Sequence, residues 1–298
     1  AVEMLAQHII TKPVFDTLFQ GNEFTKDNPI SRAIENILNE IYETNIETES
    51  KTLEKFYASV KRKSRDIVSS KSRSALLNQL YERFFKNAFP KTTDKLGVVY
   101  TPIEIVDFIN NSIEQILQKE FGKSLNDEKV HILDPFAGTG TFIVRLIESG
   151  ILKKETLLKK YLSELHSNEI ILLAYYIACI NIESAFHDIL KPNSYTKFDG
   201  AVLTDTFQLY EQERDMIANL LPDNSKKRTK QKKRDIRVII GNPPYSAGQD
   251  SAHDDAKNLT YPNLDEKIKK TYVKNSTATY RSDLYDSYIR SFRWATDR

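Results

Sequence analysis

One stretch decides the fold of this chain: Val238-Ile239-Ile240 followed directly by Gly241-Asn242-Pro243-Pro244-Tyr245. A short β-branched run is typical of a buried parallel strand, and two prolines after it stop both strand pairing and helix growth. We therefore expect a rigid turn at the carboxyl edge of a sheet, where open α/β folds keep their ligands. The asparagine amide, a backbone carbonyl and the tyrosine ring could together hold a planar amine there. Taken alone, an ordinary Pro-Pro turn after a core strand is a serious alternative.

A second stretch lies upstream and has the pattern strand, glycine turn, helix. It reads Val130-His131-Ile132-Leu133-Asp134-Pro135-Phe136-Ala137-Gly138-Thr139-Gly140-Thr141-Phe142. Gly138 and Gly140 let the backbone pass close to a ligand, and a helix beginning near Thr141 directs free N–H groups at it. Ile143 stands where the dinucleotide fingerprint has its third glycine, so a nicotinamide or flavin cofactor is disfavoured.

Taken together, these stretches resemble the DNA adenine-N6 methyltransferases that use S-adenosylmethionine. Gly97-Val98-Val99-Tyr100-Thr101-Pro102 stands where their amino-terminal motif stands, and the order of the three motifs resembles the gamma class. More narrowly, the chain from about residue 10 onward resembles the coupler and methyltransferase portion of type ISP restriction-modification enzymes. In those enzymes a single polypeptide carries nuclease, helicase, methyltransferase and target-recognition parts.

The resemblance implies that a methyl group passes from S-adenosylmethionine to the exocyclic nitrogen of a flipped-out adenine. The catalytic residues would be Asn242, Pro243, Pro244 and Tyr245. The cofactor-binding residues would be Tyr100, Thr101, Pro102, Asp134, Pro135, Phe136, Ala137, Gly138, Thr139, Gly140, Asn168, Glu169, Asp205, Thr206 and Phe207. Among these, Glu169 would take both ribose hydroxyls, Asp205 would accept from the adenine amino group, and Phe207 would pack on the ring. No metal ion is expected.

Several alternatives stay open at this point. Tyr100-Thr101-Pro102 is equally well explained as a capped helix start, and Asp205 and Phe207 as an ordinary strand end. Protein-glutamine methyltransferases and some RNA methyltransferases share the Asn-Pro-Pro-Tyr motif. A non-catalytic module that couples a helicase to its partner is a further alternative. Such a module would bind no cofactor even in the full-length protein.

Charge gives little indication of the partner, because the formal net charge is only +2. Locally, a basic run precedes the catalytic turn. It contains Lys226, Lys227, Arg228, Lys230, Lys232, Lys233 and Arg234. Such a run is usually a solvated loop, but in an enzyme acting on double-stranded DNA it could neutralise backbone phosphates.

The single cysteine, Cys179, excludes a disulfide framework and fits a reducing cytoplasm. It lies in an apolar run too short to span a bilayer and is expected to be a buried small residue. The chain starts at Ala1 and stops inside a helical pattern at Arg298, so we expect a piece of a longer protein. Nuclease, helicase and target-recognition domains are expected in the same full-length chain.

The overall expectation is an α/β fold of the class I, Rossmann-like methyltransferase kind, with strands ending near residues 134, 169, 204 and 240. The parallel sheet would be truncated after its fourth strand. Residues 1–92 are predicted to form a helical, coupler-like region, and residues 93–298 the first part of the methyltransferase domain. Asn28-Pro29 predicts one helix start, Thr101 is able to cap another, and a last helix is predicted over residues 283–296.

Overall fold

The computed structural model describes residues 2–18, 27–42, 58, 62, 101–211, 220–244, 261–277 and 282–298. Apart from residues 58 and 62, the second half of the predicted helical region, from residue 43 onward, lies outside this part of the chain, as do Tyr100 and Tyr245.

A four-stranded parallel sheet forms the centre of the described residues. Its strands are β1 (His131–Asp134), β2 (Leu165–Glu169), β3 (Ala201–Leu203) and β4 (Ile236–Ile239), in the order β3-β2-β1-β4. The predicted parallel alternation is thus confirmed, with strand ends within one residue of those expected. Because the strand order reverses direction at β1, the carboxyl ends of β1 and β4 form a switch point of the kind that binds ligands.

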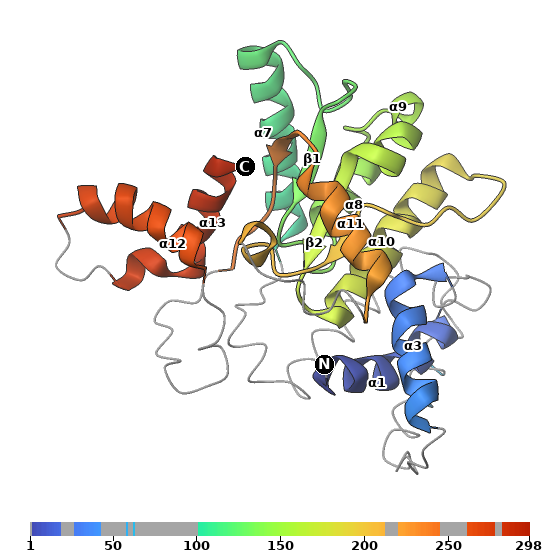
Figure 1. The fold of residues 1–298 in the computed structure, drawn as a ribbon. Helices are drawn as coiled ribbons and strands as arrows, with labels where there is room; N and C mark the ends of the chain where they lie inside the picture. Colours follow the sequence, from blue (N-terminus) through green and yellow to red (C-terminus); the bar gives the residue numbers. More distant parts are fainter. Residues whose placement is uncertain are drawn as a thin grey trace.

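Helices connect the strands and cover the sheet (Figure 1). The α-helices are α1 (Val2–Leu18), α3 (Pro29–Tyr42), α7 (Ile103–Phe121), α8 (Thr141–Glu148), α9 (Lys154–Lys159), α10 (Leu172–Leu190), α11 (Pro222–Lys232), α12 (Pro262–Ile268) and α13 (Ser287–Asp297). Shorter turns are the π-helical η1 (Lys160–Glu164) and η4 (Lys269–Val273) and the 3-10 turns η2 (Gln208–Tyr210) and η5 (Ser282–Tyr285). No helix in these described ranges is both long and apolar enough to cross a membrane.

The two faces of the sheet belong to different cores, because successive side chains of a strand point to opposite sides. Ile132 packs in the larger core with α8 and α10, whereas its neighbour Leu133 packs with α12 and α13. α10 is buried around most of its surface, and Cys179 is buried within it as predicted. The strand ends are therefore held between two packed layers.

The amino-terminal helices pack on the part of the chain that contains the sheet, α1 against α10 and α3 against α11. α3 begins at Pro29 as predicted, and the Oδ1 of Asn28 accepts the N–H groups of Ile30 and Ser31 at 3.0 and 3.2 Å. In α1, the Nδ1 of His8 lies 3.0 Å from the hydroxyl of Tyr176 on α10. Figure 1 shows α1 and α3 together at the lower right, away from α12 and α13.

Three local predictions need correction. The basic run is not a loop but most of α11, because Pro222 starts a helix and the following residues include many good helix formers and no glycine or proline. Thr101 does not cap α7: Pro102 occupies the cap position and no side chain caps the helix. The last predicted helix is interrupted, because Asp286 has extended backbone angles and α13 begins only at Ser287.

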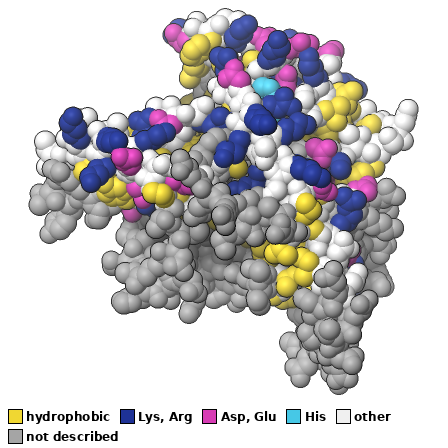
Figure 2. Space-filling model, in the orientation of Figure 1, with side chains coloured by type: hydrophobic (Ala, Val, Ile, Leu, Met, Phe, Trp, Pro, Cys, Tyr) yellow, Lys and Arg dark blue, Asp and Glu magenta, His cyan; other side chains and the backbone are white. Residues whose placement is uncertain are grey.

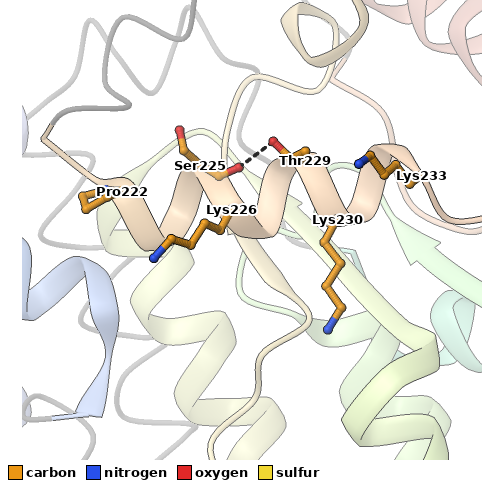
Figure 3. A pocket seen from close by; sticks show the side chains of 6 residues that line it. All are labelled: Pro222, Ser225, Lys226, Thr229, Lys230 and Lys233. Carbon is orange, nitrogen blue, oxygen red and sulfur yellow. Dashed lines mark hydrogen bonds between the residues drawn. The ribbon is translucent and has the colours of Figure 1, made fainter.

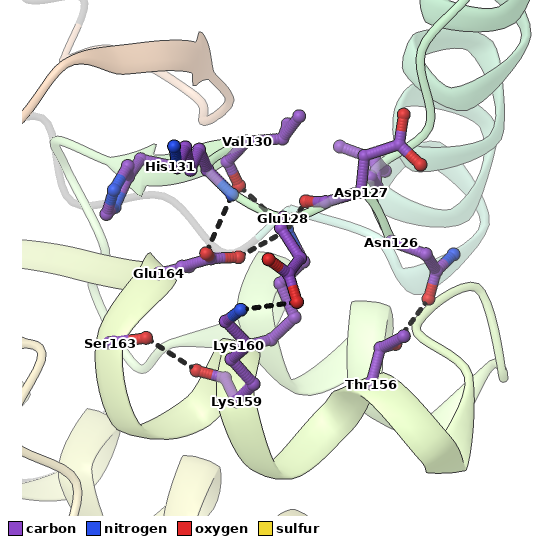
Figure 4. A network of polar contacts seen from close by, with 12 residues as sticks. Asn126, Asp127, Glu128, Val130, His131, Thr156, Lys159, Lys160, Ser163 and Glu164 are labelled. Carbon is purple, nitrogen blue, oxygen red and sulfur yellow. Dashed lines mark hydrogen bonds and ion pairs between the residues drawn. The ribbon is translucent and has the colours of Figure 1, made fainter.

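A buried ion pair joins the start of the sheet to the turn before it (Figure 4). The Nζ of Lys160 lies 2.7 Å from the Oε2 of Glu164 and also donates to the carbonyls of Asp127 and Val130, at 2.5 and 2.9 Å. The Oε1 of Glu164 accepts the N–H of Lys129 at 2.8 Å. Both charged side chains are almost fully buried. Their network joins η1, which leads into β2, to the residues directly before β1, and so it fixes the starts of both strands relative to each other.

Candidate active site

The candidate site is built on the carboxyl ends of the strands. Backbone hydrogen bonds continue past the strands themselves and tie these ends together. Ala137 donates to the carbonyl of Asn168 at 2.9 Å, Thr204 to that of Glu169 at 2.8 Å, and Ile240 to that of Leu133 at 3.0 Å. Four segments far apart in sequence are thereby brought to one edge, as the sequence predicts.

The two glycines of the turn after β1 have different roles. Both have left-handed backbone angles, with φ of +54° at Gly138 and +82° at Gly140. A Cβ on Gly140 would lie 3.2 Å from Ala178 on α10, so this glycine allows close packing between the turn and α10. A Cβ on Gly138 would meet no described atom within 4 Å, so this glycine faces open space. α8 begins directly afterwards at Thr141 and directs its first N–H groups at that space.

Glu169 lies beside this turn at the end of β2. Its Oε2 accepts the N–H of Gly138 at 2.8 Å, and its Oε1 accepts those of Ile170 and Ile171 at 2.9 and 2.8 Å. A carboxylate has about four acceptor positions, so roughly one remains. Accepting both ribose hydroxyls would thus require the N–H of Gly138 to move away. Burial raises the pKa of Glu169 to about 7, and the three backbone N–H groups counter that rise.

Asp134 lies between the glycine turn and the Asn-Pro-Pro turn. A Cβ on Gly241 would come within 2.8 Å of its Oδ1, so glycine lets β4 end beside this carboxyl without displacing it. The Oδ1 accepts the N–H of Phe136 at 3.1 Å, whereas the buried Oδ2 has no hydrogen-bond partner among the described residues. Burial raises the pKa of Asp134 to about 8. The carboxyl is therefore mostly neutral near pH 7, and a positively charged ligand beside its unpaired oxygen would favour the ionised form.

Asp205 and Phe207 follow β3. The Oδ1 of Asp205 accepts the N–H of Phe207 at 2.9 Å, and its Oδ2 accepts the hydroxyl of Tyr261 at 2.7 Å. The rings of Phe207 and Phe136 lie 5.6 Å apart between centroids. The structure thus brings together the acidic and aromatic groups expected for an adenine pocket. Tyr261, which contacts both Asp205 and Phe207, was not predicted from sequence.

Asn168 and Thr206 are buried behind these groups. The Nδ2 of Asn168 donates to the hydroxyl of Thr206 at 3.3 Å, and that hydroxyl donates to the carbonyl of Pro135 at 2.6 Å. The Oδ1 of Asn168 accepts the Nε2 of Gln231 at 2.8 Å. Their side chains therefore support the turn after β1, and direct contact with a cofactor stays a prediction for both.

Asn242 follows β4 and contacts the amino-terminal motif. Its Nδ2 donates to the hydroxyl of Thr101 at 3.1 Å, across 141 residues of sequence. Because Nδ2 faces Thr101, Oδ1 points to the other side of the amide. Pro243 and Pro244 continue the turn and have no N–H groups to offer, so their carbonyls are what this segment presents. Tyr100 and Tyr245 would flank this pair but lie outside the described residues.

Four lysines of the basic run are exposed on α11 or directly after it. Figure 2 shows Lys and Arg side chains gathered on the part of the surface where α11 lies in Figure 1. An open hollow of about 530 Å³ is lined by Pro222, Ser225, Lys226, Thr229, Lys230 and Lys233 (Figure 3). Lys232 is exposed, Arg234 is half-buried, and Lys227 pairs with Asp199 at 3.3 Å. Arg228 is half-buried and acts electrostatically on Asp205.

Gln231 was missed from sequence because it stands among seven cations. It is buried and points inward to Asn168, and Asn224 on the same face bonds both backbone groups of Leu203 at 3.0 and 2.8 Å. The seven-residue spacing of two amides places them on one helix face, and this was the available signal.

Residues 72–273 match the family model described as N-6 DNA Methylase. This chain belongs to the N-6 DNA methylase family. Residues 1–72 match the model of the coupler domain of type ISP restriction-modification enzymes. The resemblance drawn from the motifs is thereby confirmed. The two matches meet at residue 72, and the boundary we place between residues 92 and 93 stays a prediction.

Solved structures of related enzymes cover almost the whole of this N-6 DNA methylase chain. It is similar to the ATP-dependent type ISP restriction-modification enzyme LlaBIII bound to DNA, with 44% identity, a TM-score of 0.88, and coverage of 99% of this chain and 20% of that one. It is also similar to a nuclease-deletion mutant of the type ISP enzyme LlaGI in complex with a DNA substrate mimic, with 43% identity, a TM-score of 0.88, and coverage of 99% of this chain and 24% of that one. For the cryoEM structure of the DrdV-DNA complex, the identity is 37%, the TM-score is 0.87, and the coverage is 99% of this chain and 28% of that one.

The chain thus spans between a fifth and somewhat over a quarter of the length of these three relatives. A search of curated proteins gave no match.

Proposed function

We propose that this chain is the coupler and catalytic core of a site-specific DNA adenine-N6 methyltransferase within a type ISP restriction-modification enzyme. The observation that carries the proposal is the meeting of Asn242, Thr101 and Asp134 at the switch point between β1 and β4. Identity of 37–44% to three proteins solved with DNA or a DNA substrate mimic, two of them type ISP restriction-modification enzymes, supports DNA as the substrate rather than a peptide or RNA. No observation on this chain favours the protein-glutamine alternative.

The residues present fit S-adenosylmethionine. Open space above Gly138, the N–H groups of α8, the acidic side chains at three strand ends and the unpaired Oδ2 of Asp134 suit a ligand that carries a ribose, an adenine and positive charge. Thr101 and Pro102 would lie at its amino-acid end. When bound, S-adenosylmethionine supplies an electrophilic methyl group on a sulfonium sulfur.

The amino group of adenine is a poor nucleophile, because its lone pair is delocalised into the ring. The Oδ1 of Asn242 and the carbonyl of Pro243 would accept its two N–H groups, which draws the nitrogen towards a tetrahedral shape and frees the lone pair. Positioning in line with the methyl group supplies the rest of the rate. The target base must leave the duplex to reach this turn, where Tyr245 would stack on it.

The proposal is tested by methyl transfer from labelled S-adenosylmethionine in the intact protein that contains this chain. Nucleoside mass spectrometry of duplex DNA should then detect N6-methyladenine, and glutamine-containing peptides should stay unlabelled. Label on the peptide, or on cytosine instead of adenine, would overturn the assignment. Absence of any cofactor binding would favour the non-catalytic coupling module.

Cofactor affinity is expected to depend on Glu169 and on pH. Glu169→Ala should raise the Kd for S-adenosylmethionine at least tenfold, about 1.4 kcal/mol, because the ribose hydroxyls lose their acceptor. In the wild type, affinity should fall as pH decreases through about 7, because the protonated carboxyl of Glu169 accepts more weakly than the carboxylate. Calorimetry over a pH series measures both effects.

Two further variants make this prediction specific. Glu169→Gln should lose the part of the pH dependence that lies near 7. Glu155→Ala, on the exposed side of α9, removes the same charge far from the pocket and should leave the Kd unchanged. If Glu169→Ala binds as tightly as Glu155→Ala, the ribose assignment is wrong.

The exposed lysines of α11 are expected to bind DNA phosphates. Replacing Lys226, Lys230 and Lys233 with glutamine should lower the slope of log K against log salt by up to about 0.9 for each phosphate that is no longer neutralised. Sequence preference should not change, because lysines bound to phosphates read no base edges. Replacing Lys153, Lys154 and Lys159 with glutamine makes the same charge change around α9 and should leave the slope intact. Equal slopes for both triple variants would show that the basic run is solvated and does not bind DNA phosphates.

A further inference from the structure

Tyr261 lies beside the proposed adenine pocket, directly before α12. Its hydroxyl donates to the Oδ2 of Asp205 at 2.7 Å, and the edge of its ring meets the ring of Phe207 with centroids 5.3 Å apart. Its side chain is buried, although it follows a polar stretch that gives no sequence signal for a pocket residue. One side chain therefore contacts both groups expected to hold the adenine.

The position of Tyr261 is fixed from two sides. The carboxylate of Glu211 accepts the N–H groups of Asn263 and Leu264 at 2.9 and 3.0 Å, which anchors the first turn of α12. From α13, the guanidinium of Arg290 lies over the ring of Tyr261, 5.0 Å from its centroid, and makes a two-pronged ion pair with Asp265 at 2.8 and 2.9 Å. The hydroxyl is thus held in place before any ligand binds.

We propose that Tyr261 is a positioning residue that orients Asp205 to recognise the 6-amino group of the cofactor's adenine. This inference rests on the proposed function, which assigns the adenine acceptor to Asp205. It adds a residue outside the motifs, contributed by the α12 and α13 layer.

The acceptor positions of Asp205 explain how this orientation gives selectivity. Oδ1 accepts the N–H groups of Phe207 and Gln208 at 2.9 and 3.5 Å, and Oδ2 accepts the hydroxyl of Tyr261. About one of the four acceptor positions remains, on Oδ2, and it can take one N–H. An ionised carboxylate only accepts, so it favours a 6-amino group over a 6-oxo group.

Loss of the Tyr261 hydroxyl would weaken the preference for a 6-amino group in two ways. The carboxylate of Asp205 could rotate, and a larger fraction of it would be protonated. Burial raises the pKa of Asp205, while the hydrogen bond from Tyr261 and the charge of Arg228 on α11 lower it. A protonated carboxyl can donate to a 6-oxo group, so the preference between the two ligands should narrow.

The test compares two ligands in the intact protein: S-adenosylhomocysteine and its inosine counterpart, in which a 6-oxo group replaces the 6-amino group. Calorimetry should show that Tyr261→Phe lowers the ratio of the Kd for the inosine ligand to the Kd for S-adenosylhomocysteine by about tenfold or more, which is what one hydrogen bond to a charged group contributes. The ring contacts with Phe207 and Arg290 remain in this variant. As the pH is lowered, the affinity of Tyr261→Phe for S-adenosylhomocysteine should begin to fall at a higher pH than that of the wild type, because the pKa of Asp205 is higher in the variant.

The matched control is Tyr195→Phe. The hydroxyl of Tyr195 donates to the buried carboxylate of Glu183 at 2.6 Å, so this variant removes the same kind of bond from a different part of the fold. It should leave the Kd ratio as in the wild type. The ratio does not depend on how much protein is folded, because both ligands meet the same sample.

Asp205→Ser separates this proposal from the function on which it rests, because serine keeps an oxygen for the N–H of Phe207 but cannot reach the ligand. If Asp205→Ser no longer prefers S-adenosylhomocysteine to the inosine ligand but Tyr261→Phe keeps the wild-type Kd ratio, the role proposed for Tyr261 is wrong and the adenine site stands. If both variants keep the wild-type Kd ratio, the adenine site itself is wrong. We expect a lower Kd ratio in both variants and an unchanged Kd ratio in Tyr195→Phe.

Discussion

Asn242→Ala is expected to slow methyl transfer to adenine by about a hundredfold or more, or roughly 2.7–4 kcal/mol, as the loss of one preorganised polar partner does in other enzymes. The structure strengthens the reason for this effect. The Nδ2 of Asn242 donates to the hydroxyl of Thr101 at 3.1 Å, which fixes the amide so that Oδ1 lies on the side away from Thr101. In the proposed mechanism that oxygen would act most strongly in the transition state, when the amine protons become more acidic.

The effect should appear in the rate and not in cofactor binding. Single-turnover methylation of duplex DNA by the intact protein measures the rate, and calorimetry with S-adenosylmethionine measures the Kd, which should stay near the wild-type value. Asn111→Ala is the matched control, because it makes the same change on the exposed side of α7 and should methylate normally. Methylation by Asn242→Ala at the rate of Asn111→Ala would show that the assigned turn is not the catalytic one.

The strand ends could be predicted from sequence because their signals are local. The β-branched and apolar runs before Asp134 and Asn242, and the turn residues after them, are contiguous, and parallel strands bring their carboxyl ends to one edge. Glu169 and Asp205 could be placed at this edge of the sheet for the same reason. The basic run of α11 misled because its charges suggest a loop, whereas helix propensity favours a helix after Pro222.

The partners of these residues could not be predicted, because they come from distant segments. Thr101 was expected either to cap a helix or to contact the cofactor, and its hydroxyl contact with Asn242 across 141 residues was not predicted. Tyr261 contacts Asp205 only because α12 folds back onto the end of β3. Nothing within a few residues of either side chain indicates the pairing, so the motifs locate the groups that would touch ligands but not the groups that orient them.

The buried ion pair of Lys160 and Glu164 also could not be predicted from sequence. Of all the changes proposed, its loss is expected to lower the stability of the fold the most. Lys160→Met should lower the free energy of unfolding of the 298-residue chain by about 3–5 kcal/mol, because it leaves the Glu164 carboxylate buried without its counter-charge. The carbonyls of Asp127 and Val130 lose their donor as well. This is a large share of the roughly 5–15 kcal/mol that stabilises a typical domain. Urea unfolding followed by circular dichroism measures the change.

The adjacent lysine supplies the control for this prediction. Lys159 pairs with Glu128 at 2.6 Å on the surface, so Lys159→Met should cost no more than about 1 kcal/mol. If uncompensated charge is the main cause, Lys160→Met combined with Glu164→Gln should be more stable than Lys160→Met alone. The glutamine removes the buried charge and can still accept the N–H of Lys129. A double variant as unstable as Lys160→Met would instead assign the loss to the two carbonyls and to packing around β1.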